Sequence, residues 1–567
     1  MHDLLLKNAH IVDGTGAPAY GGDLVIDEGV VVDIVSPGTA SGPARRVIDA
    51  DGRAVTPGFV DAHTHLDGQL LWDPLGTPAC WHGITTVLIG HCGVTFAPVK
   101  PDDRDALAAM LETVEDIPRD AIMNSLVWNW ESYGQYLDAL DAQPKGVNVA
   151  GLIGHAAVRY YAMGERSLDK DTEPTEGELA VMVELVREAI GAGAVGFSTS
   201  RTLTHRAPDR RPIPGTYASF DELSAFAQVL GDLGKGALQL IPRFMEGEKD
   251  MQRLPQTRRE LSWMFDTSRR HGCPIVFSLF THRATRGQPA KILDMLDELS
   301  ATGGRVRPMA GLRAGTTLSS LHNFSPLTKM HPVWHELYAL PYRERIAAVR
   351  DPAWRARLSS DDGPLNEYIG NDYFLFGPER CNYERDEALR VGVVAKAEGK
   401  RPIDVVIDRM AETHGEQIFA FATNNHDVDE LEAIMDHPES LIGLGDAGAH
   451  VGYIADSSST TYTLTHWHRD QGKYTIEEAV RRITSDAAEA FGIHDRGRLA
   501  VGMPADINVI SMADLQIELP RYVHDFPCGS GRWTQKARGY DYTIVNGEVF
   551  VEDGHFTGAL AGQLVRA

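Results

Sequence analysis

Short apolar runs separated by Gly, Pro and Asp characterise both ends of the chain. They fall at 3–6, 9–12, 23–27 and 30–35 near the start and at 505–510, 541–545 and 548–551 near the end. Runs of this length between turn-forming residues are typical of β-strands. The last two runs flank Asn546-Gly547, a strong signal for a two-residue hairpin turn. We therefore expect a small β-sandwich domain built from residues 1–55 and 490–567.

In the middle of the chain, strongly apolar strands alternate with helical segments. The candidate strands are 55–61, 84–90, 147–154, 194–199, 237–241, 274–280, 305–309 and 441–446. This alternation indicates a parallel sheet with crossover helices, and eight strands are the number that a closed barrel requires. One helix carries its own start signal, because Thr175 and Glu178 have the spacing of a capping box. The sequence therefore predicts an α/β fold with a (β/α)8 TIM-like barrel over residues 56–489.

A segment at about 319–425 interrupts the alternation between the seventh and eighth strands. It carries many charges and four large aromatic residues, Trp334, Trp354, Tyr368 and Tyr373. A stretch of this length is too long for a plain loop. We expect an ordered insertion that is placed to cover the mouth of the barrel.

Composition and charge narrow the range of partners. The 567 residues are 43% hydrophobic and 23% charged, and 79 acidic against 54 basic residues give a net charge of −25. Such a surface repels phosphate backbones and anionic lipids, so neither nucleic acid nor a membrane is an expected partner. The first residues lack a signal-peptide pattern, and no segment reaches the roughly 20 apolar residues of a membrane span. Five scattered cysteines fit a reducing compartment, so we expect a cytoplasmic protein that is a monomer or a homo-oligomer.

The chemistry of a barrel of this kind lies at the carboxyl ends of its strands. The first strand ends in His63-Thr64-His65, and because alternate residues of an extended chain point the same way, both imidazoles can reach one metal ion. The second ends at Cys92, which is a ligand if a metal is bound and an ordinary apolar residue otherwise. The eighth ends at Asp446, either a metal ligand and proton acceptor or a helix N-cap.

Together these features resemble the amidohydrolase superfamily, and within it the D-aminoacylase (N-acyl-D-amino-acid deacylase) branch. The resemblance rests on Asp446 and on stretches across most of the chain, at 4–16, 57–65, 90–93, 154–155, 193–199 and 497–506. It implies that Cys92 is a metal ligand together with His63, His65 and Asp446. It also implies a metal-dependent hydrolase acting on carbon–nitrogen bonds other than peptide bonds, with Zn²⁺ as the expected metal.

Two departures from the family pattern bear on the number of metal ions. The family has a histidine at the end of the fifth strand and another at the end of the sixth, where this chain has Pro242 and Leu279. A catalytic zinc needs three protein ligands and an open position, which the four residues above can supply, so we expect one Zn²⁺ per chain. A second ion would require His205 or His282. The candidates for orienting a ligand or binding substrate are His155, Arg201, His205, Arg243, His282, Arg313 and His450.

The leading functional hypothesis is hydrolysis of a linear amide, such as an N-acyl-D-amino acid. Asp446 would take a proton from water and pass it to the leaving nitrogen, and one of the three arginines would hold a substrate carboxylate. The alternative is a cyclic amide, carbamate or ester, since the segment 308–317 replaces a tyrosine-bearing motif of the D-aminoacylases. A third hypothesis is a non-catalytic binding protein on a decayed barrel, because the histidines of strands five and six are missing.

Overall fold

Eight parallel strands, hydrogen-bonded in sequence order, form the centre of the structure. The computed structural model describes the whole chain except residues 245–253, 283–284, 324, 361–362, 378–380 and 426. The eight strands are β6 (Phe59–Asp61), β7 (Ile84–Ile89), β8 (Asn148–Gly154), β9 (Gly196–Ser200), β10 (Ala237–Ile241), β11 (Ile275–Ser278), β12 (Val306–Ala310) and β16 (Leu441–Ile442). Each lies within one of the eight predicted segments or extends it by a single residue.

The two ends of this sheet meet just beyond β6 and β16. Thr64 and Ala447 form a parallel bridge. The Asp446 N–H donates to the His63 carbonyl at 2.8 Å, and the His65 N–H donates to the Ala447 carbonyl at 2.7 Å. The eight strands therefore fit a TIM-like barrel, and its closing hydrogen bonds lie in the segments that carry three of the four candidate ligands.

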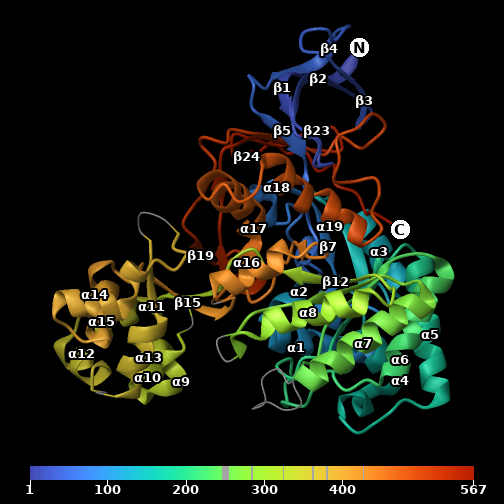
Figure 1. Cartoon of the computed structure of the whole chain (residues 1–567). Helices are drawn as coiled ribbons and strands as arrows, with labels where there is room; N and C mark the ends of the chain where they lie inside the picture. Colours follow the sequence, from blue (N-terminus) through green and yellow to red (C-terminus); the bar gives the residue numbers. More distant parts are fainter. Residues whose placement is uncertain (245–253, 283–284, 324, 361–362, 378–380, 426) are drawn as a thin grey trace.

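Helices surround this sheet and connect its strands (Figure 1). They include α1 (Arg104–Glu115), α3 (Tyr133–Ala142), α5 (Glu176–Gly191), α6 (Phe220–Leu233), α7 (Leu254–His271), α8 (Gln288–Ser300), α16 (Val428–Asp436), α18 (Ile476–Arg482) and α19 (Ser485–Ala490). The predicted capping box at the start of α5 is confirmed, because Thr175 Oγ1 accepts the Glu178 N–H and the Glu178 carboxylate accepts the Thr175 N–H. None of the helices in the described ranges combines the length and apolar character that a membrane span needs.

Strands from both ends of the chain share a second, nine-stranded sheet. It contains β1 (His2–Ile11), β2 (Tyr20–Asp27), β3 (Val30–Val35), β4 (Ala44–Asp49), β5 (Ala54–Pro57), β17 (Ile507–Ile510), β22 (Tyr540–Val545), β23 (Glu548–Glu552) and β24 (His555–Phe556). The hairpin turn at Asn546-Gly547 is confirmed, and both residues have positive φ, 46° and 81°. The sandwich arrangement and the domain boundaries stay predictions.

One expectation for this sheet is wrong, because β1 is a single strand where the sequence predicts two. Its pairing with β2 shifts register between Leu6 and Ala9. Asn8, inside this shift, has a φ of 54°. Such an irregularity bends a strand without ending it, which is why the apolar pattern is broken while the strand continues.

Two polar joints connect the terminal sheet to the barrel. Asp506 accepts hydrogen bonds from the Asn148 side chain at the start of β8 and from the Asn546 N–H, both at 2.8 Å. Arg496 Nε lies 2.9 Å from the same carboxylate, and both side chains are 5% exposed. These contacts fix the relative position of β8 and the β22–β23 turn.

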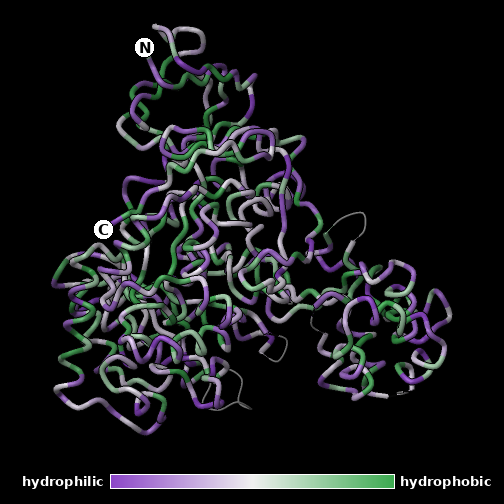
Figure 2. Tube along the Cα trace, turned by 180° about the vertical axis from the view of Figure 1, so that it is seen from behind, coloured by the Kyte–Doolittle hydropathy of each residue, from purple (hydrophilic) through white to green (hydrophobic). Residues whose placement is uncertain are grey.

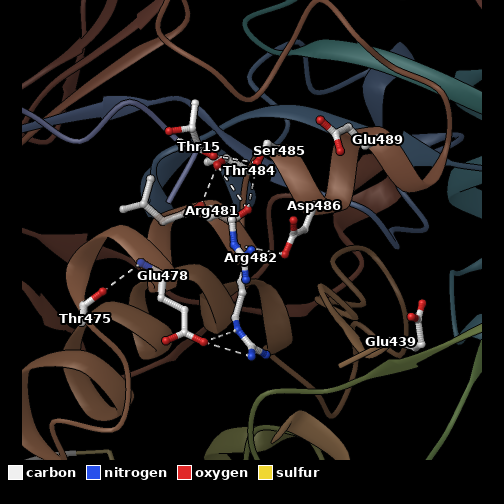
Figure 3. Close-up of polar contacts among 12 residues, drawn as sticks. Thr15, Glu439, Thr475, Glu478, Arg481, Arg482, Thr484, Ser485, Asp486 and Glu489 are labelled. Atoms are coloured by element: carbon white, nitrogen blue, oxygen red, sulfur yellow. Dashed lines mark hydrogen bonds and ion pairs between the residues drawn. The ribbon is translucent and has the colours of Figure 1, made fainter. Parts of the chain in front are cut away.

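The second joint involves α18 and α19 (Figure 3). Ser485, the first residue of α19, donates from Oγ to the Gly14 carbonyl of the N-terminal segment at 2.6 Å. On α18, Arg482 pairs with Glu478 one turn earlier, at 3.1 Å. The hydrogen bond from Ser485 thereby attaches the N-terminal segment to α19, which follows the last barrel strand, β16, in the sequence.

The segment at 319–425 forms a helical lobe beside the barrel, seen from opposite sides in Figures 1 and 2. At its base, β15 (Ile418–Asn424) pairs antiparallel with β13 (Gly315–Ser319) and β14 (Phe374–Phe376). Its helices are α9 (Leu327–Met330), α10 (Pro332–Ala339), α11 (Tyr342–Ala348), α12 (Pro352–Leu358), α13 (Pro364–Asp372), α14 (Val391–Glu398) and α15 (Pro402–Glu412). Trp334 and Tyr373 are buried in a separate hydrophobic core of the lobe. The aromatic residues thus stabilise the lobe itself, and a covering role stays a prediction.

The Asp506–Arg496 pair gives the first prediction. Asp506→Ala leaves the buried guanidinium of Arg496 with only the Asp495 carboxylate, which is 60% exposed, and removes the acceptor of the Asn148 side chain, so it should cost up to about 3–5 kcal/mol of unfolding free energy. The matched control is Asp138→Ala, whose side chain is 71% exposed and pairs with Arg566, and which should cost less than about 1 kcal/mol. Urea unfolding followed by circular dichroism measures both. Equal, small effects would show that the Asp506 joint contributes little.

Candidate metal centre

Four side chains at the carboxyl ends of three barrel strands converge. Cys92 Sγ lies 3.5 Å from His63 Nε2 and 3.6 Å from His65 Nε2. Asp446 Oδ1 lies 3.7 Å and 3.4 Å from the same two nitrogens. The potential ligand atoms of His63, His65 and Cys92 all lie within 4.8 Å of one another. The structure thus brings together the four residues for which the sequence predicts metal binding.

The separations suit a tetrahedral zinc site. With Zn–N and Zn–O of about 2.0–2.1 Å and Zn–S of about 2.3 Å, a tetrahedral angle separates nitrogen and oxygen ligands by about 3.4 Å and nitrogen and sulfur by about 3.6 Å. The four distances above are close to these values. The donor set of two imidazoles, a thiol and a carboxylate is also one that zinc accepts. His63, His65 and Cys92 therefore fit three ligand positions of one metal ion, and Asp446 lies beside the two histidines but outside the group of three whose ligand atoms are all within 4.8 Å of one another.

The backbone is strained at two of the four positions. Cys92 has a φ of 56° and Asp446 a φ of 54°, in the left-handed region that non-glycine residues rarely adopt. The residue before Asp446 has to be glycine, because a Cβ at Gly445 would lie 2.3 Å from Asp61 Oδ2. Strain of this kind concentrates at functional sites, where the surrounding structure holds it in place.

Burial controls the protonation of these groups. It lowers the pKa of His63 to about 3 and raises the pKa of the Cys92 thiol to about 12. Burial also acts to raise the pKa of Asp446, but the hydrogen bond from His65 and the nearby imidazoles outweigh it and hold this pKa below its usual range. The neutral imidazole of His63 and the ionised carboxylate of Asp446 are ready to ligate. Burial acts to lower the pKa of His65, but the nearby Glu115 and Cys92 raise it well above its usual value, so His65 and the Cys92 thiol must each lose a proton to bind a cation.

Glu115 is a buried carboxylate that the sequence analysis missed. Its Oε1 lies 3.5 Å from His65 Nδ1, the ring nitrogen not directed at Cys92 and Asp446. A carboxylate at this nitrogen fixes the orientation and tautomer of a metal-binding histidine. Glu115 follows the buried Leu107 and Leu111 at four-residue intervals on α1, so the available signal was a carboxylate on an apolar helix face.

Other polar residues near the centre were also missed. His91, next to Cys92, stacks on the His63 ring with centroids 4.1 Å apart. Asp67 continues the alternation of His63 and His65, is fully buried, and has its pKa raised to about 6 by burial. The signal for Asp67 was therefore the same period of two that revealed the two histidines.

The four residues line a cavity of about 370 Å³. Pro242 and Leu279, which stand where the family has histidines, line the same cavity and have no ligand atom. The predicted site residues His205, His282 and His450 line it as well. So do Tyr453 and Asp456, which the sequence analysis did not select.

The histidines of the cavity wall have partners of their own. His205 Nδ1 is 3.0 Å from Ser200 Oγ, and His450 Nδ1 is 2.9 Å from the Tyr453 hydroxyl. Burial lowers the pKa of His205 to about 3, so its ring is neutral. These rings therefore shape the cavity beside the four converging groups.

Arg201 and His155 each have a buried carboxylate partner within the protein, and their predicted roles at the substrate or a ligand stay predictions. Arg201 forms two 3.0 Å hydrogen bonds with the buried Glu260. His155 is hydrogen-bonded at 2.8 Å to Glu222. Both are fully buried and absent from the described lining of the metal cavity. Their partners are 59 and 67 residues away in the sequence, so a buried ion pair could not be read from either residue alone.

The other two predicted arginines also lie beyond the described lining of this cavity. The Arg243 guanidinium lies over the Tyr217 ring, 5.1 Å from its centroid. Arg313 lines a neighbouring cavity. Of the three arginines considered for a substrate carboxylate, Arg313 is thus the one next to a second open space.

Comparison with known proteins agrees with this site. The model of the Amidohydrolase family matches residues 46–551, so the chain belongs to the amidohydrolase family and is a hydrolase of carbon–nitrogen bonds. Membership of this family of hydrolases argues against the third hypothesis, that the chain is a non-catalytic binding protein on a decayed barrel.

Individual relatives cover nearly the whole chain. The D-aminoacylase of Alcaligenes xylosoxydans xylosoxydans is 26% identical over 99% of this chain and 97% of the relative. The N-acyl-D-glutamate deacylase of the same organism is 28% identical over 96% and 93%. The crystal structure of N-acyl-D-glutamate deacylase from Bordetella bronchiseptica, complexed with zinc and a phosphonate inhibitor, is similar with a TM-score of 0.65 at 25% identity, over all of both chains.

Metal content tests the centre directly. Elemental analysis of protein produced with added zinc should find about one zinc per chain, because His63, His65 and Cys92 form a single group of ligands with Asp446 beside it. His63→Ala and Cys92→Ala should lose most of this zinc. His205→Asn and His282→Asn are the controls and should retain it. Two zinc ions per chain, with one lost in either control variant, would replace the single-ion site by a two-ion site.

The contact of Glu115 with His65 predicts a role in metal affinity. Glu115→Gln should weaken zinc binding about 10- to 100-fold, as is usual when the partner of a ligating histidine is changed. Competition with a chromogenic chelator measures the affinity. Glu112→Gln, on the exposed side of the same helix, should leave it unchanged. An affinity in Glu115→Gln equal to that of the wild type would mean that the carboxylate does not orient His65.

Proposed function

We propose that the chain hydrolyses a linear amide of the N-acyl amino acid class, with one zinc ion held by His63, His65, Cys92 and Asp446. The observation that carries this proposal is the convergence of these four groups, with four distances of 3.4–3.7 Å between them, beside a cavity of about 370 Å³. The names of two relatives, D-aminoacylase and N-acyl-D-glutamate deacylase, favour the same substrate class here.

Asp446 is the group best placed to move a proton. A bound zinc ion would supply Lewis acidity, which polarises a carbonyl and acidifies water. The Asp446 side chain is 25% exposed, whereas His63 and His65 are almost completely covered. Water and substrate can therefore reach Asp446 but not the imidazoles. Because its low pKa keeps it ionised, Asp446 can accept the proton of the attacking water and deliver it to the leaving nitrogen.

The apolar part of the metal cavity suits an acyl group. Its apolar lining includes Ile241, Pro242, Phe244, Leu279, Phe280, Leu444 and Ile454. Pro242 and Leu279 belong to this wall, so the positions that lack histidines contribute apolar surface instead. Such a wall binds hydrocarbon and excludes water around the scissile amide. This supports one metal ion with an apolar pocket beside it.

Turnover of a substrate panel tests the proposal. Zinc-loaded protein should release amino acid from N-acetyl-amino acids, assayed as both enantiomers by chromatography. Asp446→Asn should lower kcat about 100-fold or more while most of the zinc remains, because a general base contributes about 10²- to 10⁴-fold.

Two results would contradict the proposal. Turnover in Asp446→Asn close to that of the wild type would exclude this residue as the base. Faster hydrolysis of cyclic imides, carbamates or esters than of every N-acyl amino acid would replace the linear amide by the alternative substrate class.

A further inference from the structure

A second cavity, of about 610 Å³, adjoins the metal cavity and is not used by the mechanism above. His282 lines both cavities. Arg313 lines the second, and its ion-pair partner Asp456, at 2.9 Å, lines the metal cavity. The two spaces therefore meet at His282 and at the Arg313–Asp456 ion pair, with Arg313 on the side of the second cavity and Asp456 on the side of the metal cavity.

Arg313 is buried with hydrogen-bonding capacity left over. Its side chain is 5% exposed, and its Nη2 donates to the Ala455 carbonyl at 3.2 Å and to Ser458 Oγ at 3.1 Å. Its Nε and Nη1 have no hydrogen-bond partner among the described residues. An unsatisfied buried donor on a charged group is costly and requires an explanation. An oxygen atom of a ligand bound in the adjoining cavity could accept hydrogen bonds from Nε and Nη1.

Several other charged side chains that line this cavity are paired within the protein. Lys473 pairs with Glu432 and Asp436, Arg286 with Asp427, and Glu384 with His466. Arg313 differs from these residues because two of its donor atoms remain after its own ion pair is formed. An entering anion would therefore be attracted to Arg313 in preference to the paired cations.

The wall beside Arg313 is aromatic and includes a rare backbone conformation. Tyr383 stacks on the guanidinium, 3.6 Å from ring centroid to Cζ. The segment Thr463–Asp470 is a π-helix that contributes His466 and Trp467 to the lining. Trp467 Nε1 donates to the carbonyl of Leu312, next to Arg313, at 2.8 Å. Because π-helices are uncommon and occur frequently at functional sites, this wall is an independent sign of a binding role.

We propose that the second cavity binds the amino-acid half of the substrate. Arg313 donates from Nε or Nη1 to its carboxylate, and the aromatic wall packs against a large apolar or aromatic side chain. The acyl half then lies in the apolar metal cavity. This inference rests on the proposed function and specifies its substrate class as N-acyl aromatic amino acids.

Three amides of similar size test the assignment. N-acetylphenylalanine has its carboxylate on the amine side, N-acetylphenethylamine has none, and N-succinylphenethylamine has its carboxylate on the acyl side. In Arg313→Lys, which keeps the charge but loses the planar donor set, kcat/KM for N-acetylphenylalanine should fall about 10- to 100-fold. The value for N-acetylphenethylamine should change less than about twofold, because that amide has no carboxylate for Arg313 to bind.

A matched control and a second variant separate binding from folding. Arg496→Lys removes another buried, ion-paired arginine, far from the cavity lining, and should leave the ratio between the two substrates unchanged. His466→Ala shortens the aromatic wall and should reduce kcat/KM for N-acetylphenylalanine more than for N-acetylalanine. Both selectivities are ratios within one preparation, so partial unfolding does not alter them.

Several outcomes would overturn the inference. Equal losses on the first two substrates in Arg313→Lys would show a structural role only. A loss confined to N-succinylphenethylamine would place the carboxylate on the acyl half. If no amide is turned over, the proposed function is wrong, but the binding site can still be tested on its own. Calorimetry of N-acetylphenylalanine with the zinc-loaded protein then measures whether the second cavity binds this compound. Binding that weakens in Arg313→Lys would support the site, whereas absence of binding to the wild type would reject it.

Discussion

The closure of the barrel between its first and last strands is the constraint on which the site depends. Backbone hydrogen bonds from Asp446 to His63 and from His65 to Ala447 join the two edges of the sheet. Three of the four converging side chains belong to these same residues. Their relative positions are therefore fixed by main-chain bonds, and only Cys92, from the next strand, is positioned independently. The main-chain bonds place these residues, and Glu115 then contacts the His65 ring from α1.

Much of the fold could be predicted because it depends on local patterns. The eight strands follow from runs of apolar residues, and the pairing of His63 with His65 follows from the alternation of side chains along an extended chain. Glu115 could not be predicted with the same ease, since its contact with His65 depends on where α1 packs against the barrel. The buried partners of Arg201 and His155 could not be predicted for the same reason, because these carboxylates come from helices distant in the sequence.

The two proposals together would divide the recognition of substrate into an apolar part and a polar part. Around the metal centre, Pro242 and Leu279 give an apolar wall where related proteins are expected to have further ligands. Polar recognition would lie at Arg313, where Asp456 and His282 mark the border between the two spaces. The reaction centre of the amidohydrolase family is thus combined with a surrounding surface that differs in chemistry. This combination is what a change of substrate with an unchanged reaction requires.

The helical lobe has a core of its own, yet its base reaches both cavities. Thr423 and Asn424 line the metal cavity, and Asn425 lines the second. Mutations within the lobe's helices can therefore accumulate with little effect on the reaction centre, as long as β15 keeps its pairing with β13. Residues 423–425 do not share this freedom. In evolutionary terms the lobe is a module that can diverge, and its attachment point is where such divergence would first alter what the enzyme accepts.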